Sequence, residues 1–268
     1  ASYNMSRLFT FGCSFTHYHW PTWADIIGQE FDYYENWGQG GQGNHFIFNS
    51  LNECAIKNNI NSNDTVIIMW SDIYREDIYN NKEWKSDNDN KYQFNKNDPR
   101  GYLIKNLGFI NSTKIMLDHF GCNYYFLSLV PVDKDPGFWG QSCEIPNDTI
   151  SDSDIRDHYK SCLEIIKPSI YETVFNSNWN SRTFVPKNYP NTAPNRIDFH
   201  ASTAEHLEYL DAVLPVIPLS DNTRAWVNEV QEHLTQDPAG QDPFNMSNYR
   251  PWVWTLPPLW TYQKVKRL

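Results

Sequence analysis

Two kinds of hydrophobic pattern alternate along the chain. Short apolar runs rich in aromatic and β-branched residues predict buried strands, and longer stretches with apolar positions every three or four residues predict helices. The strand pattern covers 7–11, 33–37, 65–70 and 123–130, and the helical pattern covers 21–30, 44–57 and 101–121. Strands that alternate with helices are typical of βαβ units. We therefore expect an α/β protein built around a mostly parallel sheet.

The first predicted strand ends in residues that suit a nucleophile. Gly12 follows the strand directly, and Ser14 comes two residues later. Glycine permits the sharp turn of a strand-to-helix elbow, and such a turn would set the Ser14 hydroxyl at the carboxyl end of the strand, where open α/β sheets bind ligands. Ser14 is thus a candidate nucleophile. The alternative is a serine that only caps a following helix.

An acid and a histidine stand close together toward the other end of the chain. Asp198 and His200 precede an apolar-periodic run that starts at Ala204. Asp198 would hold one nitrogen of the imidazole and so determine its tautomer, which leaves the other nitrogen of His200 to take a proton from Ser14. The alternative is that Asp198 or Ser202 caps the helix and that His200 lies on the surface.

A glycine-dense turn lies between the second predicted strand and the helix that follows it. Its glycines are Gly38, Gly40, Gly41 and Gly43. A turn of this kind exposes backbone N–H groups that suit an oxyanion or a phosphate. The spacing differs from the G-x-G-x-x-G fingerprint of dinucleotide-binding proteins, so we expect no cofactor. A nucleotide- or phosphate-binding protein stays open as an alternative for this turn.

Together these segments, in this order, resemble the SGNH (GDSL-like) hydrolase superfamily. The family's first block, a strand that ends in G-[DN]-S, is similar to 12–16, where Cys13 replaces the usual acidic or amide residue. Its second block, often N-x-G-x-x-G, is similar to 36–41 and makes Gly41 the oxyanion-hole glycine. Its fifth block, an acid and a histidine before the last helix, is similar to 198–200 in the form D-x-H.

The resemblance implies both a fold and a mechanism. The family fold is a flavodoxin-like three-layer α/β/α sandwich, which we expect over residues 1–215. Ser14 would attack an ester carbonyl, His200 would take and return the proton, and Asp198 would orient His200. The backbone amides of Ser14 and Gly41 would hold the oxyanion. The implied activity is that of a carboxylic ester hydrolase, such as an acetylesterase, acting on a small-molecule or carbohydrate ester.

One block of the family departs from the pattern. The third block ends a buried strand with G-x-N-D, whose asparagine donates to the oxyanion, whereas Ser71 and Asp72 follow the strand here. The hydroxyl of Ser71 is expected to serve in its place. Loss of one donor typically costs about a hundred- to a thousand-fold in rate, so the alternative is a weak or inactive relative that binds or assembles. The motifs are also similar to those of SGNH-like proteins of marine bacteriophages, in which that alternative would be a virion component.

Three further residues beside these motifs are expected to contact the substrate, namely His17, Asn44 and Trp70. His17 and His19 form the only close histidine pair of the sequence. They lack nearby cysteine or acidic ligands in a recognised arrangement, so we expect no metal site.

The composition of the chain limits which partners the protein is expected to bind and in which compartment it is expected to lie. The chain has 268 residues, a formal net charge of −10, and 40% hydrophobic content. Nucleic acids and anionic membrane surfaces both need a basic face, so neither is expected as a partner. No apolar run reaches a membrane span, and no basic region followed by an apolar stretch marks a signal peptide. With an odd number of cysteines, five in all, we expect reduced thiols and a cytoplasmic protein, or a virion-associated one if it is phage-encoded.

Two segments lie outside the family pattern. Residues 216–268 form an extension rich in tryptophan and proline, in which prolines interrupt 249–260 and exclude a continuous helix there. We expect the extension to pack on the core or on a partner, either a virion or a second copy of the chain. An insertion at 79–100, rich in Asn, Asp and Lys, is expected to form a solvated loop or lid.

Overall fold

A parallel sheet forms the centre of the protein. The computed structural model describes residues 5–80, 83–86, 99–133, 152–182 and 199–235. The strand order of the central sheet is β2-β1-β3-β6. Its strands are β1 (Arg7–Phe11), β2 (Tyr33–Asn36), β3 (Asp64–Trp70) and β6 (Asn123–Ser128). All three pairings are parallel, which confirms the expected sheet and places the carboxyl ends of the strands at one edge.

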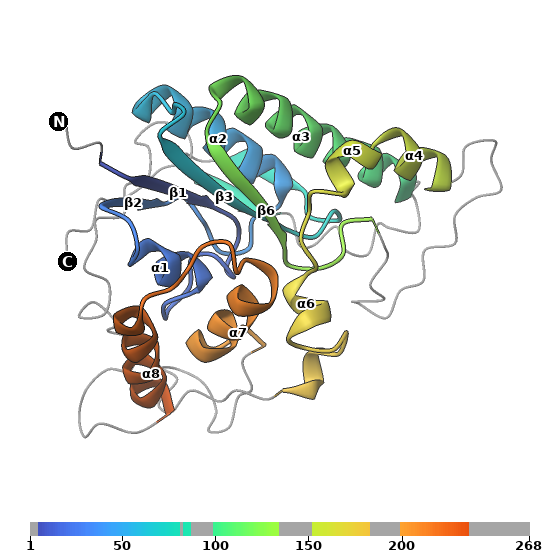
Figure 1. Cartoon of the computed structure of the whole chain (residues 1–268). Coiled ribbons are helices and arrows are strands. Elements are labelled where there is room, and N and C mark those ends of the chain that lie inside the picture. The colour runs from blue at the N-terminus through green and yellow to red at the C-terminus, as the bar shows by residue number, and fades with distance from the viewer. Residues whose placement is uncertain (1–4, 81–82, 87–98, 134–151, 183–198, 236–268) are drawn as a thin grey trace.

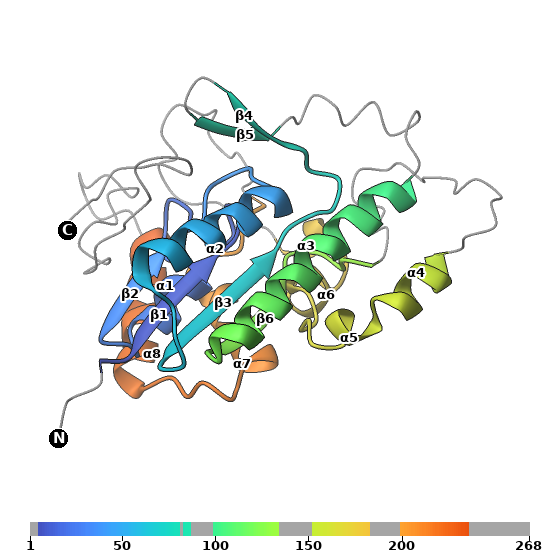
Figure 2. The same ribbon diagram turned by 90° about the horizontal axis from the view of Figure 1, so that it is seen from above.

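Helices cover both faces of this sheet (Figure 1). One face carries α2 (Asn44–Asn58) and α3 (Pro99–Phe120), with α4 (Asp152–His158) and α5 (Lys160–Leu163) beside α3. The other face carries α1 (Trp23–Gly28), α6 (Ile170–Thr173), α7 (Thr203–Val213) and α8 (Asp221–Thr235). Figure 2 shows α2 and α3 side by side across the sheet. None of the helices in the described ranges is long and apolar enough to cross a membrane.

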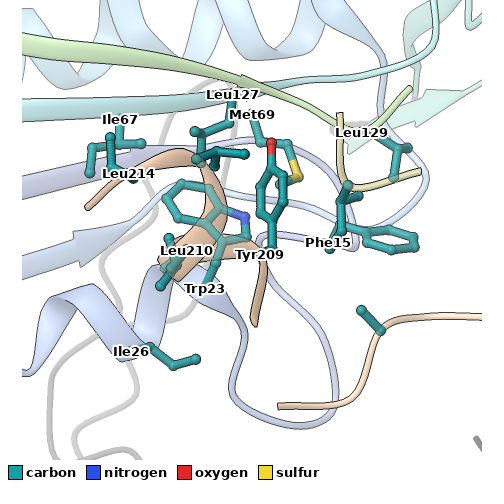
Figure 3. Packing of buried hydrophobic residues seen from close by; sticks show 14 of the residues in the cluster. Phe15, Trp23, Ile26, Ile67, Met69, Leu127, Leu129, Tyr209, Leu210 and Leu214 are labelled. Atoms are coloured by element: carbon teal, nitrogen blue, oxygen red, sulfur yellow. The ribbon is translucent and has the colours of Figure 1, made fainter. Parts of the chain in front are cut away.

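Two hydrophobic clusters, one on each face, bury the sheet. Because successive side chains of a strand point to opposite faces, β3 contributes to both clusters. Ile67 and Met69 pack toward α1 and α7, where Trp23 and Tyr209 are also buried (Figure 3). Val66, Ile68 and Trp70 belong to the cluster beneath α2 and α3. A strand buried on both faces gives the continuous apolar run that marks it in the sequence.

Capping residues mark the ends of several helices, close to where the hydrophobic pattern predicts those ends. Thr22 is the N-cap of α1 and forms a capping box with Asp25. Asn59, in the left-handed region at φ 50°, caps the C-terminus of α2. Gly121, at φ 68°, follows α3 and allows the chain to turn into β6. The observed bounds differ from the predicted ones by a few residues, as in α1, which is shorter than the predicted 21–30.

The first part of the C-terminal extension packs on the core. In α8, Val227, Val230 and Leu234 are fully buried. Val230 and Leu234 form a small cluster with Trp20, which comes from the segment after β1. Glu30 accepts hydrogen bonds from the chain at the start of α8, including one of 2.5 Å from the Thr223 hydroxyl. Residues 216–235 thus belong to the folded body, and 249–260 lies outside the described residues.

The insertion contains a hairpin where a solvated loop was expected. Strands β4 (Asp77–Asn80) and β5 (Glu83–Ser86) pair antiparallel and lie apart from the central sheet (Figure 2). The Trp84 ring packs edge-on against Phe46 of α2, with ring centroids 6.0 Å apart. This aromatic contact anchors the hairpin on α2. The mostly polar composition of the insertion did not predict it. Residues 87–98 lie outside the described residues.

Candidate active site

The turn after β1 is a tight elbow in which the Thr16 side chain packs directly on Gly12. A Cβ atom on Gly12 would lie 1.9 Å from the Thr16 Oγ1 atom, an impossible overlap. The amides of Thr16 and His17 both donate to the Cys13 carbonyl, at 2.9 Å and 3.1 Å, and close the turn. Ser14 therefore lies at the carboxyl end of β1 with 8% of its surface exposed.

The structure brings the candidate nucleophile and the candidate base together. The Nε2 atom of His200 lies 2.8 Å from the Oγ atom of Ser14, although the two residues are 186 positions apart in the chain. The alternative role of Ser202 also holds, because its side chain accepts from the Glu205 amide and caps α7. His200 stands just before this cap, so the helix start fixes the backbone that presents the imidazole to Ser14. His200 is half-buried and is not a free surface histidine.

Two aromatic rings of the elbow segment contact His200. The Tyr18 ring is stacked on the imidazole, with centroids 3.8 Å apart and an interplanar angle of 15°. The Phe15 ring lies 4.9 Å away at 32°. The segment that carries Ser14 therefore also holds the ring of its partner. Asp198, the predicted acid, lies outside the described residues, and its role stays a prediction.

The glycine-dense turn lies against the elbow. The Gln39 amide donates to the Gly12 carbonyl at 3.1 Å. The Nδ1 atom of His17 lies 2.8 Å from the Gly38 carbonyl oxygen, a geometry in which Nδ1 carries the proton and donates. His17, expected to contact substrate, thus ties the turn to the elbow. A Cβ atom on Gly40 would lie 3.9 Å from the Ser14 Cβ, which shows how near the turn comes to the hydroxyl.

Among the described residues, two of the predicted oxyanion donors, the amides of Ser14 and Gly41, have no competing acceptor. Gly41 has a φ of 78°, a conformation that side-chain-bearing residues rarely adopt. An amide without an intramolecular partner near a nucleophile is able to bind the oxygen of a substrate carbonyl.

Ser71, the third predicted donor, is held by a buried chain of amides. The Asn44 side chain accepts from the Ser71 amide at 2.7 Å and donates to the Ser71 carbonyl at 3.0 Å. It also donates to the Asn106 side chain at 2.8 Å, and Asn106 donates to the Ile73 carbonyl at 2.9 Å. The Ser71 Oγ atom is buried and has no hydrogen-bond partner within the described ranges. Its role as an oxyanion donor stays a prediction.

Two of the residues expected to contact substrate are structural. Asn44 is fully buried, and its amide is used by Ser71 and Asn106. Trp70 is also fully buried, with its ring edge-on to Phe126 at 5.5 Å in the cluster beneath α2 and α3. The alternation of β3 places the Trp70 ring on the face covered by α2 and α3, so it has no exposed surface for the substrate contact that was expected.

A second histidine, His206, lies behind the site and was not singled out from the sequence. It is 1% exposed, and its ring meets Phe15 edge-on at 6.1 Å. Burial lowers the pKa of His206 to about 3, with a smaller contribution from the nearby His200. His206 is therefore neutral near pH 7. Its place on the buried face of α7, three and four residues before Tyr209 and Leu210, is the sequence signal for a core position.

A carboxylate already occupies the N-terminus of α2. Asp77 of β4 accepts from the Gly43 amide at 2.6 Å and from the Phe46 amide at 2.8 Å. Burial raises the pKa of Asp77, and these two amides oppose that rise. Gly43, the N-cap residue, has no side chain to do this, so the hairpin supplies the cap from a distance. Asp77 thus takes the Gly43 and Phe46 amides at the helix start, and the phosphate-binding alternative is left with the other amides of the glycine-dense turn.

Comparison with models of known protein families finds no match for the chain, and no curated protein matches its sequence at a significant level. The geometry around Ser14 and His200 is therefore the evidence that bears on function.

Proposed function

We propose that this protein is a serine ester hydrolase of the SGNH type, with a flavodoxin-like three-layer fold. The observation that carries the proposal is the 2.8 Å contact between Ser14 Oγ and His200 Nε2. This distance is within the reach that a nucleophile and its general base require. The contact lies at the carboxyl end of a parallel strand, the usual place of ligands in α/β sheets.

The reaction we propose is acyl transfer to water. His200 removes the proton of Ser14 as Oγ attacks the ester carbonyl, and a tetrahedral intermediate forms. The amides of Ser14 and Gly41, together with the Ser71 hydroxyl, donate to its oxyanion. His200 then returns the proton to the leaving alcohol. In the second half, His200 takes a proton from the attacking water and passes it to Ser14 Oγ as the acyl–oxygen bond breaks and the carboxylic acid leaves. Asp198 is proposed to orient the imidazole, as the family resemblance implies.

The charge of the protein favours a neutral substrate. A formal net charge of −10 repels anions at long range. An uncharged ester, on a small molecule or a carbohydrate, meets no such barrier. We therefore propose acetyl and short acyl esters as the first substrates to examine.

The test is hydrolysis of p-nitrophenyl acetate and butyrate by the wild type, Ser14→Ala and His200→Ala. Matched controls are Ser112→Ala and His119→Ala, because both residues are exposed on α3, away from the elbow. We expect each site variant to lose at least about a thousand-fold in kcat, and the controls to keep wild-type rates. Circular dichroism should show that all five proteins are folded.

The opposite result selects the binding or assembly alternative. If the wild type acts no faster than Ser14→Ala on these esters and on acetylated oligosaccharides, the proposed hydrolysis is rejected. Copurification in a large particle would then identify the protein as an assembly component.

A further inference from the structure

We propose that Tyr18 is the positioning residue of His200, holding the imidazole on Ser14 and stabilising its charged form. The inference rests on the proposed function, since it assigns His200 the work of a base. The two rings are nearly parallel at 15° with centroids 3.8 Å apart, a full face-to-face stack. Phe15, the other ring in contact, is more distant and more tilted. Tyr18 is therefore the closer restraint on the imidazole plane.

His200 needs such a restraint because no regular element holds its ring. Its backbone precedes α7 in a bend, outside any helix or strand. A histidine side chain in such a place turns about two bonds, and only some of its orientations place Nε2 near Ser14 Oγ. A parallel ring in van der Waals contact blocks rotation out of the stacking plane. The 2.8 Å contact with Ser14 then fixes which nitrogen points to the hydroxyl.

The stack also has an electrostatic consequence during catalysis. When His200 takes the Ser14 proton, its ring becomes a cation over the face of Tyr18. Aromatic faces carry negative charge density and attract a cation within about 6 Å of the ring centroid. This attraction is stronger for the protonated imidazole than for the neutral one. Tyr18 would thus act mainly on the transition state, in which the positive charge develops.

Tyr18 is itself held by a buried tryptophan. The Trp20 ring meets Tyr18 edge-on, with centroids 4.6 Å apart and an angle of 83°. The indole N–H of Trp20 donates to the Ala201 carbonyl at 2.8 Å, one residue beyond His200. Trp20 in turn packs on Val230 of α8. The backbone and the ring of the His200 segment are therefore tied to the same aromatic pair, which makes the position of Tyr18 well defined.

Phe15 is a poorer candidate for this role. It is 7% exposed and packs into the main cluster on the α1 and α7 face, so its removal would disturb the fold. Tyr18 is half-buried, and its replacement removes the stack with less damage to the core. A substitution at Tyr18 therefore tests the positioning of His200 without a large loss in the stability of the fold.

The test compares Tyr18→Phe, which keeps the ring, with Tyr18→Leu, which removes it. Tyr124→Leu is the control, because Tyr124 is a half-buried tyrosine in β6 that bonds to Asp118 away from the site. Two measurements are made on each protein. The first is kcat and KM for p-nitrophenyl butyrate. The second is the orientation of the His200 ring, followed by NMR as the number and line width of its ring resonances.

We expect kcat of Tyr18→Leu to fall about 2- to 30-fold, the range for loss of one cation–π contact. KM should stay within about twofold, because the contact is made with His200 and not with substrate. The wild type should show one sharp set of His200 ring resonances, and Tyr18→Leu should show broadened or additional ones, because its imidazole samples more orientations. Tyr18→Phe should restore both readouts, and Tyr124→Leu should change neither.

The kinetic and NMR measurements distinguish a failure of the Tyr18 proposal from a failure of the proposed function. If the wild type shows no Ser14-dependent hydrolysis, the function fails, and the NMR comparison alone still decides whether Tyr18 orients His200. If the His200 ring resonances of Tyr18→Leu are as single and sharp as those of the wild type, or its kcat falls no further than that of Tyr18→Phe, the positioning role is overturned.

Discussion

The buried histidine His206 predicts how stability depends on pH. In the folded protein its ring lies in an apolar setting beside Phe15, and its Nδ1 atom has no hydrogen-bond partner within the described ranges. Burial holds its pKa at about 3, whereas an ordinary histidine has 6.5. The perturbation we consider is His206→Leu, which replaces the imidazole with an apolar side chain that cannot be protonated. Because the Nδ1 atom makes no hydrogen bond to lose, this replacement should be tolerated near pH 7.

The difference in proton binding between the unfolded and the folded protein gives the sign and the size of the change in the free energy of unfolding. Below about pH 6.5 the unfolded chain binds a proton at His206, whereas the folded protein does so only when the pH approaches 3. The free energy of unfolding therefore falls as the pH falls toward 3. One pKa unit corresponds to about 1.4 kcal/mol. At pH 5, His206 should therefore cost the wild type about 2 kcal/mol relative to pH 7.5.

The assay is urea unfolding of the wild type and His206→Leu at pH 7.5 and pH 5. Other titrating groups are common to both proteins and cancel in the comparison. The wild type should lose about 2 kcal/mol more than His206→Leu over this interval. His119→Leu, at an exposed position of α3, should lose as much as the wild type. An equal loss in His206→Leu and the wild type would refute the assignment of a neutral, buried His206.

Three further predictions concern the elements that surround the site. Asp77→Ala leaves the amides at the start of α2 without their acceptor and should lower the free energy of unfolding by about 1–3 kcal/mol in urea titrations; unchanged stability would show that water replaces the carboxylate. Gly12→Ala forces a Cβ atom onto Thr16 and should cost about 1–3 kcal/mol. A fluorophosphonate probe should also label Ser14 more slowly in that variant, and wild-type labelling would mean that the elbow tolerates the overlap. Leu234→Ala removes packing between α8 and Trp20 and should cost roughly 2–5 kcal/mol in thermal or urea unfolding, whereas a negligible loss would contradict the integration of α8 into the core.

The contacts that hold the site come from distant parts of the chain. Asp77 caps α2 from a hairpin, and Asn106 of α3 supports the amide chain that holds Ser71. Trp20 links the His200 segment to α8. Each of these links joins two elements that approach only when the sheet and its helices are assembled. The site is therefore expected to form late and cooperatively, with the rest of the fold.

The sequence by itself indicated the main strands and helices and the parallel character of the central sheet. The apolar run 65–70 indicated a buried strand, and the alternation with helices indicated a parallel sheet, because both signals depend on periodicities that neighbouring residues carry. Gly12 marked the elbow for a similarly local reason, since a side chain there would overlap Thr16, four residues on. Ser14 and His200 were also singled out from their local motifs.

Only the tertiary structure decided which of these residues meet. The distance between Ser14 and His200 depends on how β1 and α7 pack, and no local pattern encodes it. The same holds for Trp70, which looked like a site residue because it ends a strand beside the predicted donors. The register of β3 against β1 and β6 turned its ring into the core. Local patterns reveal how a segment folds, whereas the partner of each side chain is set by contacts across the sheet and between its layers.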